Sequence, residues 1–169
     1  TPGNYDFTGN KDIAAFCKLA QKHGMYVIVR PGPYVCAEWE MGGLPWWLLK
    51  NDSVELRTLD PYYMERVGMF MHEVGKQLED LQITRGGNII MVQVENEYGS
   101  YATDKPYVSA IRDTVRAAGF TEVPLFQCDW SSNFLNNGLD DLIGLSTSEP
   151  EPTSTNNLPS CVKCVPKLR

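Results

Sequence analysis

The chain has 169 residues, of which 43% are hydrophobic and 21% are charged, and its formal net charge is −6 at pH 7. These proportions are typical of a globular domain and argue against an intrinsically disordered chain. The acidic balance and the scattered Lys and Arg residues argue against a nucleic-acid partner, because phosphate binding needs clustered positive charge. No apolar run approaches the roughly 20 residues of a membrane-spanning helix, so we expect no membrane partner. The first residues show no targeting signal that would assign a compartment.

The first part of the chain predicts a helix followed directly by a buried strand. Apolar residues at helical spacing run through residues 10–23, and Gly24 is the glycine stop typical of a helix C-terminus. The apolar run 25–29 follows as a strand, and Pro31 ends it because proline cannot donate to a continuing ladder. The irregular residues 34–59 are rich in aromatic and acidic side chains, and a loop of that length is typically functional.

Two further helix–strand units follow. The second helix begins with Asp60 as N-cap and Pro61 as its first residue, and it leads to an apolar strand at residues 88–92. The third helix covers residues 106–118 and leads to a strand at residues 123–128. The buried stripe of the second helix comprises Met64, Val67, Met71, Val74, Leu78 and Leu81.

Strict alternation of helices with buried strands predicts an α/β fold with a parallel sheet, either a closed barrel or an open doubly wound sheet. Long acidic and aromatic segments after successive strands favour the barrel, where sites collect at the carboxyl ends of the strands. No glycine-rich phosphate turn supports a dinucleotide fold. A complete barrel needs about 250 residues and eight units. We therefore predict a partial (β/α)8 TIM barrel.

The most informative segment is residues 92–100, which place Glu95 and Glu97 at the end of a buried strand. Strand alternation predicts that these two carboxylates share one face while Asn96 points to the other, unless a bulge intervenes. Two like charges at such a place either raise the pKa of one member or bind something positive. Both outcomes indicate a functional site and not a purely structural turn.

Carboxylates and aromatic residues follow each strand without a histidine, which suits a carbohydrate ligand because sugar faces stack on rings and hydroxyls bond to acids and amides. For the tryptophans, core packing and sugar stacking both stay open. His23 and His72 fall on predicted helices and are expected at the surface. The tryptophans concerned are Trp39, Trp46, Trp47 and Trp130.

No cofactor or metal is predicted. The spacing of Cys161 and Cys164 is weak support for zinc, because no second pair or nearby histidine accompanies it. An acidic divalent-metal site on Glu38, Glu95 and Glu97 is a further hypothesis that lacks support from histidine or aspartate.

Three segments resemble the signatures of family 35 glycoside hydrolases, the β-galactosidases. These are RPGPY at residues 30–34, CAEWEMGGLP at residues 36–45 and QVENEYGS at residues 93–100. The resemblance covers residues 1–143 and implies a (β/α)8 barrel whose strands three to five are the ones predicted above. It also suggests a secreted, periplasmic or lysosome-like compartment.

The resemblance also implies the site residues. Glu97 is implied as the general acid/base and Asn96 as a substrate-binding residue beside it. Cys36, Ala37 and Glu38 match the galactose contacts of the family, where backbone and carboxylate groups hold the sugar hydroxyls. Glu95 is expected to support Glu97 rather than to react.

The implied reaction is a retaining hydrolysis of terminal β-linked galactose in an oligosaccharide or glycan, by double displacement between two glutamates. In the family the nucleophile is a glutamate at the end of strand seven, and nothing after residue 143 resembles that strand. We therefore expect the isolated chain to be inactive. The alternative is a non-catalytic galactoside-binding module.

Residues 144–169 differ from the rest, because Ser, Thr, Pro and Glu dominate and no periodicity remains. Composition predicts an aberrant, disordered tail. Read one base earlier, the codons of residues 145–148 permit Thr-Ile-Asn-Phe, which the family carries at this place. We hypothesise that a frameshift created the tail, with a genuine divergent tail as the alternative; the nucleotide sequence of the gene decides between them.

Overall fold

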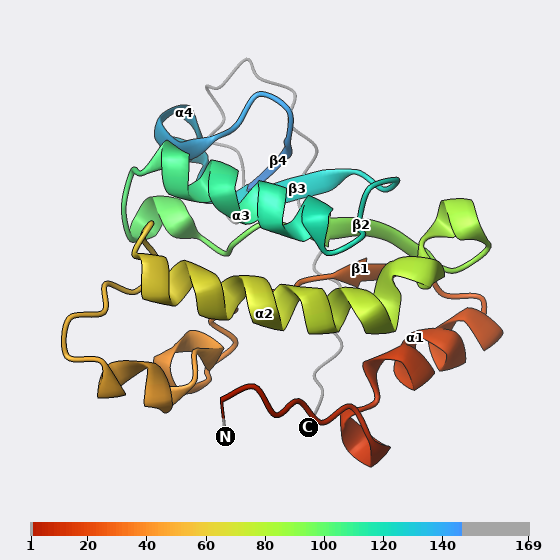
Figure 1. Ribbon diagram of the computed structural model, residues 1–169. Coiled ribbons are helices and arrows are strands. Elements are labelled where there is room, and N and C mark those ends of the chain that lie inside the picture. The colour runs from red at the N-terminus through yellow and green to blue at the C-terminus, as the bar shows by residue number, and fades with distance from the viewer. Residues whose placement is uncertain (1, 147–169) are drawn as a thin grey trace.

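The computed structural model describes residues 2–146, which form a four-stranded parallel sheet with the order β1-β2-β3-β4. The long helices α2 and α3 lie together on one face of this sheet (Figure 1). Neighbouring strands follow the chain order without a reversal, as in the wall of a (β/α) barrel and unlike a doubly wound sheet. The strands are Val27–Val29 (β1), Ile89–Gln93 (β2), Leu125–Asp129 (β3) and Ile143–Ser146 (β4).

Aspartate caps begin the three longer helices. The side chains of Asp12, Asp60 and Asp104 each accept a hydrogen bond from the backbone N–H three residues later, which satisfies one of the free donors of the first turn. The predicted N-cap at Asp60 is confirmed, with Pro61 following it. The helices are Ile13–Lys22 (α1), Pro61–Leu78 (α2), Lys105–Ala117 (α3) and Phe134–Asn137 (α4).

Short 3-10 turns account for most differences between predicted and observed helix ends. The first helix begins at Ile13 and not at residue 10, because a 3-10 turn precedes the Asp12 cap. The long loop between β1 and α2 holds two more such turns. The 3-10 segments are Gly9–Lys11 (η1), Glu40–Gly43 (η2), Trp46–Lys50 (η3), Glu79–Leu81 (η4), Ile83–Arg85 (η5), Tyr98–Ser100 (η6) and Ser131–Asn133 (η7).

The sequence predicted three strands, and the structure adds β4, which pairs with β3 from Phe126↔Ile143 to Asp129↔Ser146. The prediction missed it because the strand is four residues long and Gly144 interrupts its apolar pattern. β4 crosses the boundary at residue 143 where the barrel sequence was expected to end. Most of the predicted tail, with Cys161 and Cys164, lies outside the described residues.

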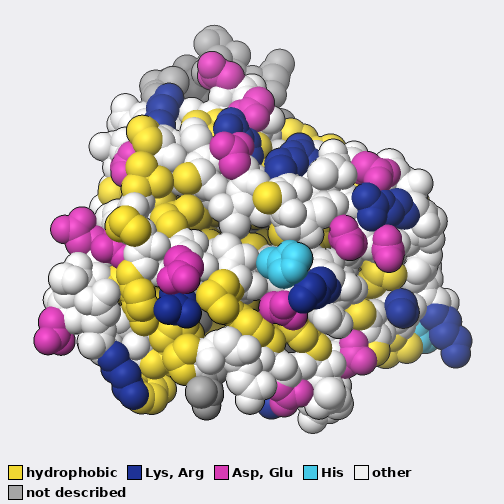
Figure 2. Space-filling view, viewed as in Figure 1, with side chains coloured by type: hydrophobic (Ala, Val, Ile, Leu, Met, Phe, Trp, Pro, Cys, Tyr) yellow, Lys and Arg dark blue, Asp and Glu magenta, His cyan; other side chains and the backbone are white. Residues whose placement is uncertain are grey.

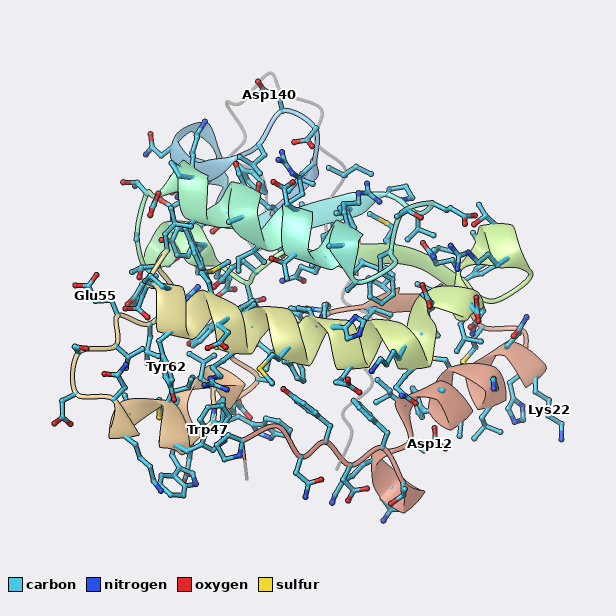
Figure 3. All side chains as sticks on the ribbon, viewed as in Figure 1. Asp12, Lys22, Trp47, Glu55, Tyr62 and Asp140 are labelled. Carbon is cyan, nitrogen blue, oxygen red and sulfur yellow. The ribbon has the colours of Figure 1, made fainter. Side chains whose placement is uncertain are left out.

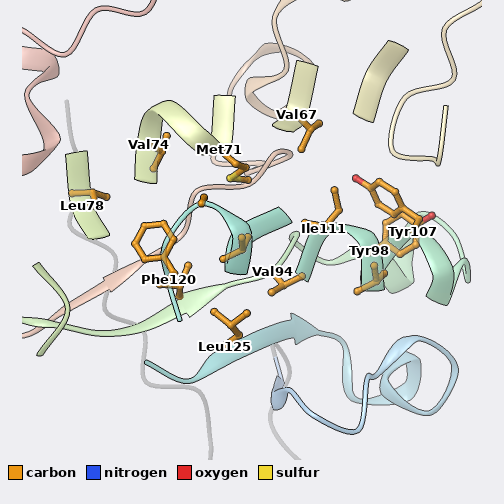
Figure 4. Packing of buried hydrophobic residues seen from close by; sticks show 14 of the residues in the cluster. Val67, Met71, Val74, Leu78, Val94, Tyr98, Tyr107, Ile111, Phe120 and Leu125 are labelled. Carbon is orange, nitrogen blue, oxygen red and sulfur yellow. The ribbon is translucent and has the colours of Figure 1, made fainter. Parts of the chain in front are cut away.

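The core lies between α2, α3 and the sheet (Figure 4). In the predicted stripe of α2, Val67, Met71, Val74 and Leu78 are buried, whereas Met64 and Leu81 are partly buried. Each fully buried side chain of this kind stabilises the fold by roughly 1.5–3 kcal/mol. The two helices approach closely, because a Cβ atom on Gly75 would collide with the carbonyl group of Ala118.

Several apolar side chains on and beside the sheet stay exposed. Tyr26 is 70%, Met25 55%, Ile28 41% and Ile143 42% exposed. On the helix-bearing face, by contrast, positive and negative side chains are interspersed (Figure 2). None of the helices within residues 2–146 is long and apolar enough to cross a membrane.

Candidate active site

The predicted site residues follow the carboxyl ends of neighbouring parallel strands. Cys36, Ala37 and Glu38 lie on the loop after β1, Asn96 and Glu97 follow β2, and Asp129 is the last residue of β3. These strand ends share one edge of the sheet, because β1, β2 and β3 pair in parallel. The sequence therefore places acidic groups on one edge.

The prediction that Glu95 and Glu97 share one strand face is wrong, because strand geometry ends at Gln93. Glu95 and Glu97 both adopt left-handed backbone, with φ of 57° and 48°. Glu95 is 1% exposed, whereas Glu97 is partly exposed. A left-handed non-glycine residue costs roughly 1–2 kcal/mol, so the surrounding contacts must hold this turn in place.

Glu95 is held by an ion pair with Arg57 in the interior. Arg57 donates from Nε to Oε1 at 3.0 Å and from Nη2 to Oε2 at 2.7 Å. Tyr107 donates its hydroxyl to Oε1 at 2.9 Å, and the backbone N–H of Asn96 donates to Oε2 at 2.6 Å. Both carboxylate oxygens are thus occupied, which fits Glu95 as a supporting group.

Arg57 is itself surrounded by tyrosine rings. Its guanidinium carbon lies 3.9 Å from the ring centre of Tyr34, 4.5 Å from that of Tyr101 and 5.3 Å from that of Tyr98. Nη2 also donates to the Asn96 carbonyl at 2.9 Å. The guanidinium therefore fastens the long loop after β1 to the turn after β2. Sequence reasoning missed this role, because nothing in the local pattern marks Arg57.

Tyr107 and Tyr98, which lie beside this ion pair, stay neutral. Burial, and then the charge of Glu95, raise the pKa of Tyr107 well above its ordinary value. Burial, with smaller contributions from Asp104 and Glu95, raises the pKa of Tyr98 to about 12. The Tyr107 hydroxyl therefore acts as a hydrogen-bond donor to Glu95. Figure 4 shows the Tyr98 and Tyr107 rings side by side at the end of the core, with their centres 4.8 Å apart.

The side chain of Asn96 is fixed from β2 and from the end of β1. Its Oδ1 atom accepts from Arg30 Nη2 and, at 2.9 Å, from Gln93 Nε2. Arg30 Nε also donates to Gln93 Oε1 at 2.7 Å, which closes a ring of three polar side chains. This ring directs the amide oxygen of Asn96 towards the protein. Arg30 and Gln93 belong to the motifs noted in the sequence, but no role was predicted for them.

Asp129 is a buried carboxyl group at the same edge, with 1% exposure. Its Oδ1 atom accepts from the backbone N–H of Gly99 at 2.7 Å. Burial raises its pKa to about 6; the charges of Glu95 and Glu97 add to this, and the Gly99 hydrogen bond opposes it. In the sequence, Asp129 directly follows the strand predicted at residues 123–128, and no role was predicted for it.

Cys36, Ala37 and Glu38 form a run of left-handed residues with φ of 60°, 52° and 57°. All three are exposed. In the described part of the chain, no hydrogen bond or ion pair joins them to Asn96 or Glu97. The hydrogen bond between Cys36 and Tyr34 adds to burial in raising the pKa of that tyrosine. Within this run the Cys36 carbonyl accepts from the backbone N–H of Trp39 at 3.0 Å.

The tryptophans divide into two groups. Trp39, Trp46 and Trp130 are 70%, 67% and 50% exposed, so they are not core residues here. Trp47 packs against the core on the same side of the molecule as Tyr62 at the start of α2 (Figure 3). His23 and His72 are exposed, which confirms their predicted surface positions.

No metal centre is formed by the described residues. Within residues 2–146, no group of three His, Cys, Asp or Glu side chains is arranged to hold a metal ion. The hypothesis of a divalent-metal site on Glu38, Glu95 and Glu97 has no support here, because Arg57 already neutralises Glu95.

A parallel sheet wound in chain order, with acidic and amide groups at its carboxyl edge, defines an α/β protein and agrees with one part of a barrel. Comparison with known proteins gives the family. The model of glycosyl hydrolases family 35 matches residues 1–162. The chain belongs to this family, which is a TIM-barrel family, and the resemblance predicted from the motifs is confirmed.

Individual relatives agree with this assignment. The chain is 43% identical over 148 residues to a β-galactosidase of Xanthomonas manihotis, covering 88% of this chain and 25% of the relative. It is 42% identical over 171 aligned positions to a human β-galactosidase, covering 98% of this chain and 25% of the relative. A mouse β-galactosidase is 46% identical over 132 residues, covering 78% of this chain and 20% of the relative. The chain thus spans about a quarter or less of the length of these relatives.

Proposed function

We propose that this chain is part of a retaining β-galactosidase that removes terminal β-D-galactosyl residues, and that Glu97 is its general acid/base. The observation that carries the proposal is the unequal environment of the two glutamates after β2. Glu95 is buried and bound to Arg57 and Tyr107. The side chain of Glu97 is partly exposed, and in the described part of the chain it has no ion pair or hydrogen bond. Only Glu97 is free to reach a substrate.

The reaction is a double displacement. A second carboxylate attacks the anomeric carbon while Glu97, which begins protonated, gives its proton to the departing glycosidic oxygen. Glu97 then takes a proton from the water that hydrolyses the glycosyl-enzyme intermediate. Retention requires the two carboxyl groups to lie about 5–5.5 Å apart. The nucleophile comes from outside this chain, so the isolated chain is inactive.

The galactosyl group is held by residues of the loops that surround Glu97. Because Arg30 and Gln93 occupy the Asn96 oxygen, the amide NH₂ group is left to donate to a sugar hydroxyl. The left-handed backbone of Cys36 and Ala37 and the carboxylate of Glu38 supply further hydrogen bonds. Exposed tryptophans on the flanking loops offer flat apolar surfaces for the sugar.

The test compares three forms of the full-length gene product on aryl and alkyl β-galactosides: wild type, Glu97→Gln and the control Glu55→Gln. Glu55 is exposed on the long loop after β1, and within residues 2–146 its carboxylate makes no hydrogen bond or ion pair (Figure 3). We expect Glu97→Gln to lower kcat by roughly 10²–10⁴-fold on an alkyl galactoside. The loss in kcat/KM should be much smaller on a dinitrophenyl galactoside, because kcat/KM reports the first displacement and this leaving group needs little protonation. On that substrate kcat should stay low, because Glu97 also deprotonates the water of the second displacement. The control should match the wild type.

Unaltered turnover by Glu97→Gln would contradict the assignment of the acid/base. Galactose binding by a wild-type protein that hydrolyses no β-galactoside would favour the alternative, a non-catalytic galactoside-binding module.

A further inference from the structure

The turn that carries Glu97 is fastened to the neighbouring strand β3 at two points. The backbone N–H of Glu97 donates to the Cys128 carbonyl at 2.9 Å. Two residues later, the backbone N–H of Gly99 donates to Oδ1 of Asp129 at 2.7 Å. One anchor is a backbone group that any residue supplies, and the other depends on the Asp129 side chain.

The segment after β3 fits closely around this turn. A Cβ atom on Gly99 would lie 2.6 Å from Cβ of Asn133, 2.7 Å from Nδ2 of Asn137 and 2.9 Å from Oδ1 of Asp129. Glycine is therefore required at position 99 by the approach of these three side chains. The segment after β3 thus leaves no room for a side chain at position 99, and the Asp129 hydrogen bond ties the turn to β3.

Stability alone does not account for a carboxyl group at position 129. The group is almost fully buried, and burial favours its neutral form, so ionisation of Asp129 opposes folding. Among the residues that the structure describes, none forms an ion pair with Asp129, in contrast to Glu95 with Arg57. A buried carboxyl at a strand end, close to other carboxylates, is typical of a functional site.

We propose that Asp129 is a positioning residue for Glu97: by holding the N–H of Gly99, it fixes the left-handed turn that orients the Glu97 carboxyl group. The inference rests on the proposed function of Glu97. Glu97 is a left-handed non-glycine residue, so its conformation depends on anchors at both ends of the turn. Without the Asp129 anchor, the acid group is misplaced relative to the glycosidic oxygen.

The test uses the full-length gene product with Asp129→Ala, which removes the acceptor, and Asp129→Asn, which keeps an oxygen acceptor for the Gly99 N–H. The control is Asp140→Ala, which alters an exposed carboxylate on the loop before β4 (Figure 3). We expect Asp129→Ala to lower kcat on an alkyl β-galactoside about 100-fold, because small misplacements of a catalytic group have effects of this size. KM should change less than about threefold, and Asp129→Asn should recover kcat to within about tenfold of wild type.

Substrates with different leaving groups separate positioning of the acid from a general loss of structure. The loss of kcat/KM in Asp129→Ala should shrink on a dinitrophenyl galactoside, because kcat/KM reports the first displacement and this leaving group needs little protonation. Partial unfolding instead lowers kcat/KM equally on both substrates. Should Asp129→Ala fail to fold, Asp129→Leu fills the space without an acceptor and takes its place.

Two results would overturn the inference while leaving the role of Glu97 intact. One is a folded Asp129→Ala or Asp129→Leu protein with near wild-type kcat. The other is a folded Asp129→Asn protein as inactive as the alanine variant, which would show that the charge and not the acceptor is needed. A wild-type protein without activity, or an active Glu97→Gln protein, would instead remove the proposed function.

Discussion

Replacing Arg57 with methionine tests whether the buried ion pair holds the turn that carries Glu95 and Glu97. The substitution keeps much of the side-chain volume but leaves the Glu95 carboxylate without its charged partner. Both side chains are buried, with exposures of 6% for Arg57 and 1% for Glu95. Arg57→Met also removes the hydrogen bond to the Asn96 carbonyl and the contacts with three tyrosine rings.

The expected magnitude follows from the burial of the remaining charge. Breaking a buried ion pair by removing one partner costs about 3–5 kcal/mol, because the other charge stays buried without compensation. An exposed pair is worth about 0–1 kcal/mol. Lys76–Glu73 is such a pair, at 2.6 Å with exposures of 52% and 29%. Lys76→Met is therefore the matched control, with an expected effect of no more than about 1 kcal/mol.

Amide hydrogen exchange measures this effect locally in the full-length protein. A loss of 3 kcal/mol corresponds to exchange roughly 100-fold faster, at about 1.4 kcal/mol per tenfold. We expect that acceleration in the peptide covering residues 95–101 for Arg57→Met, and no change there for Lys76→Met. In the double variant with Glu95→Gln the two effects should not add, because the neutral amide no longer needs the guanidinium. Unchanged exchange in Arg57→Met, or additive effects, would refute the reasoning.

Three further outcomes are expected. In thermal unfolding of the full-length protein, Gly75→Ala on α2 should lower stability by about 1–3 kcal/mol, because the new Cβ meets Ala118. Gly68→Ala on the same helix should raise stability by up to about 1 kcal/mol, because its Cβ meets no atom within 4 Å. Folding raises the pKa of Asp129 from 3.8 to about 6, so ionisation of this group lowers the stability of the protein as pH rises from about 4 to 6. Asp129→Asn should therefore stabilise the protein by up to about 3 kcal/mol at pH 7 and have little effect at pH 4. The isolated chain should bind a hydrophobic dye and lack a cooperative urea transition, because no strand within residues 2–146 pairs with the outer edges of β1 and β4 and Tyr26 is exposed. A sharp transition would contradict this.

Apolar spacing and capping residues in the sequence were sufficient to predict the long helices and the parallel sheet. The periodic apolar stripe of α2 and the cap at Asp60 predicted that helix within a few residues. The alternation of helices and strands predicted a parallel sheet, and the sheet follows chain order. β4 was missed because four residues including Gly144 carry too little pattern to distinguish a strand from a loop.

The contacts that define the candidate site were beyond local pattern. Arg57 and Glu95 are separated by 38 residues, and Asp129 and Gly99 by 30. Neither pairing leaves a periodic signal in the sequence. A carboxylate at the end of a buried strand was the available signal for Asp129, and the same signal had pointed to Glu95 and Glu97.

The left-handed turn explains why two glutamates two residues apart cannot exchange roles. In a regular strand both would have faced the same way and competed for one environment. Because left-handed residues replace the strand after β2, Glu95 is bound by Arg57 and Tyr107 in the interior, whereas Glu97 remains partly exposed. The backbone strain of the turn is offset by interactions of Glu95 on one side and by β3 on the other. If Glu97 is the acid/base that we propose, a change at Arg57 or Asp129 should therefore alter catalysis although neither side chain needs to touch the substrate.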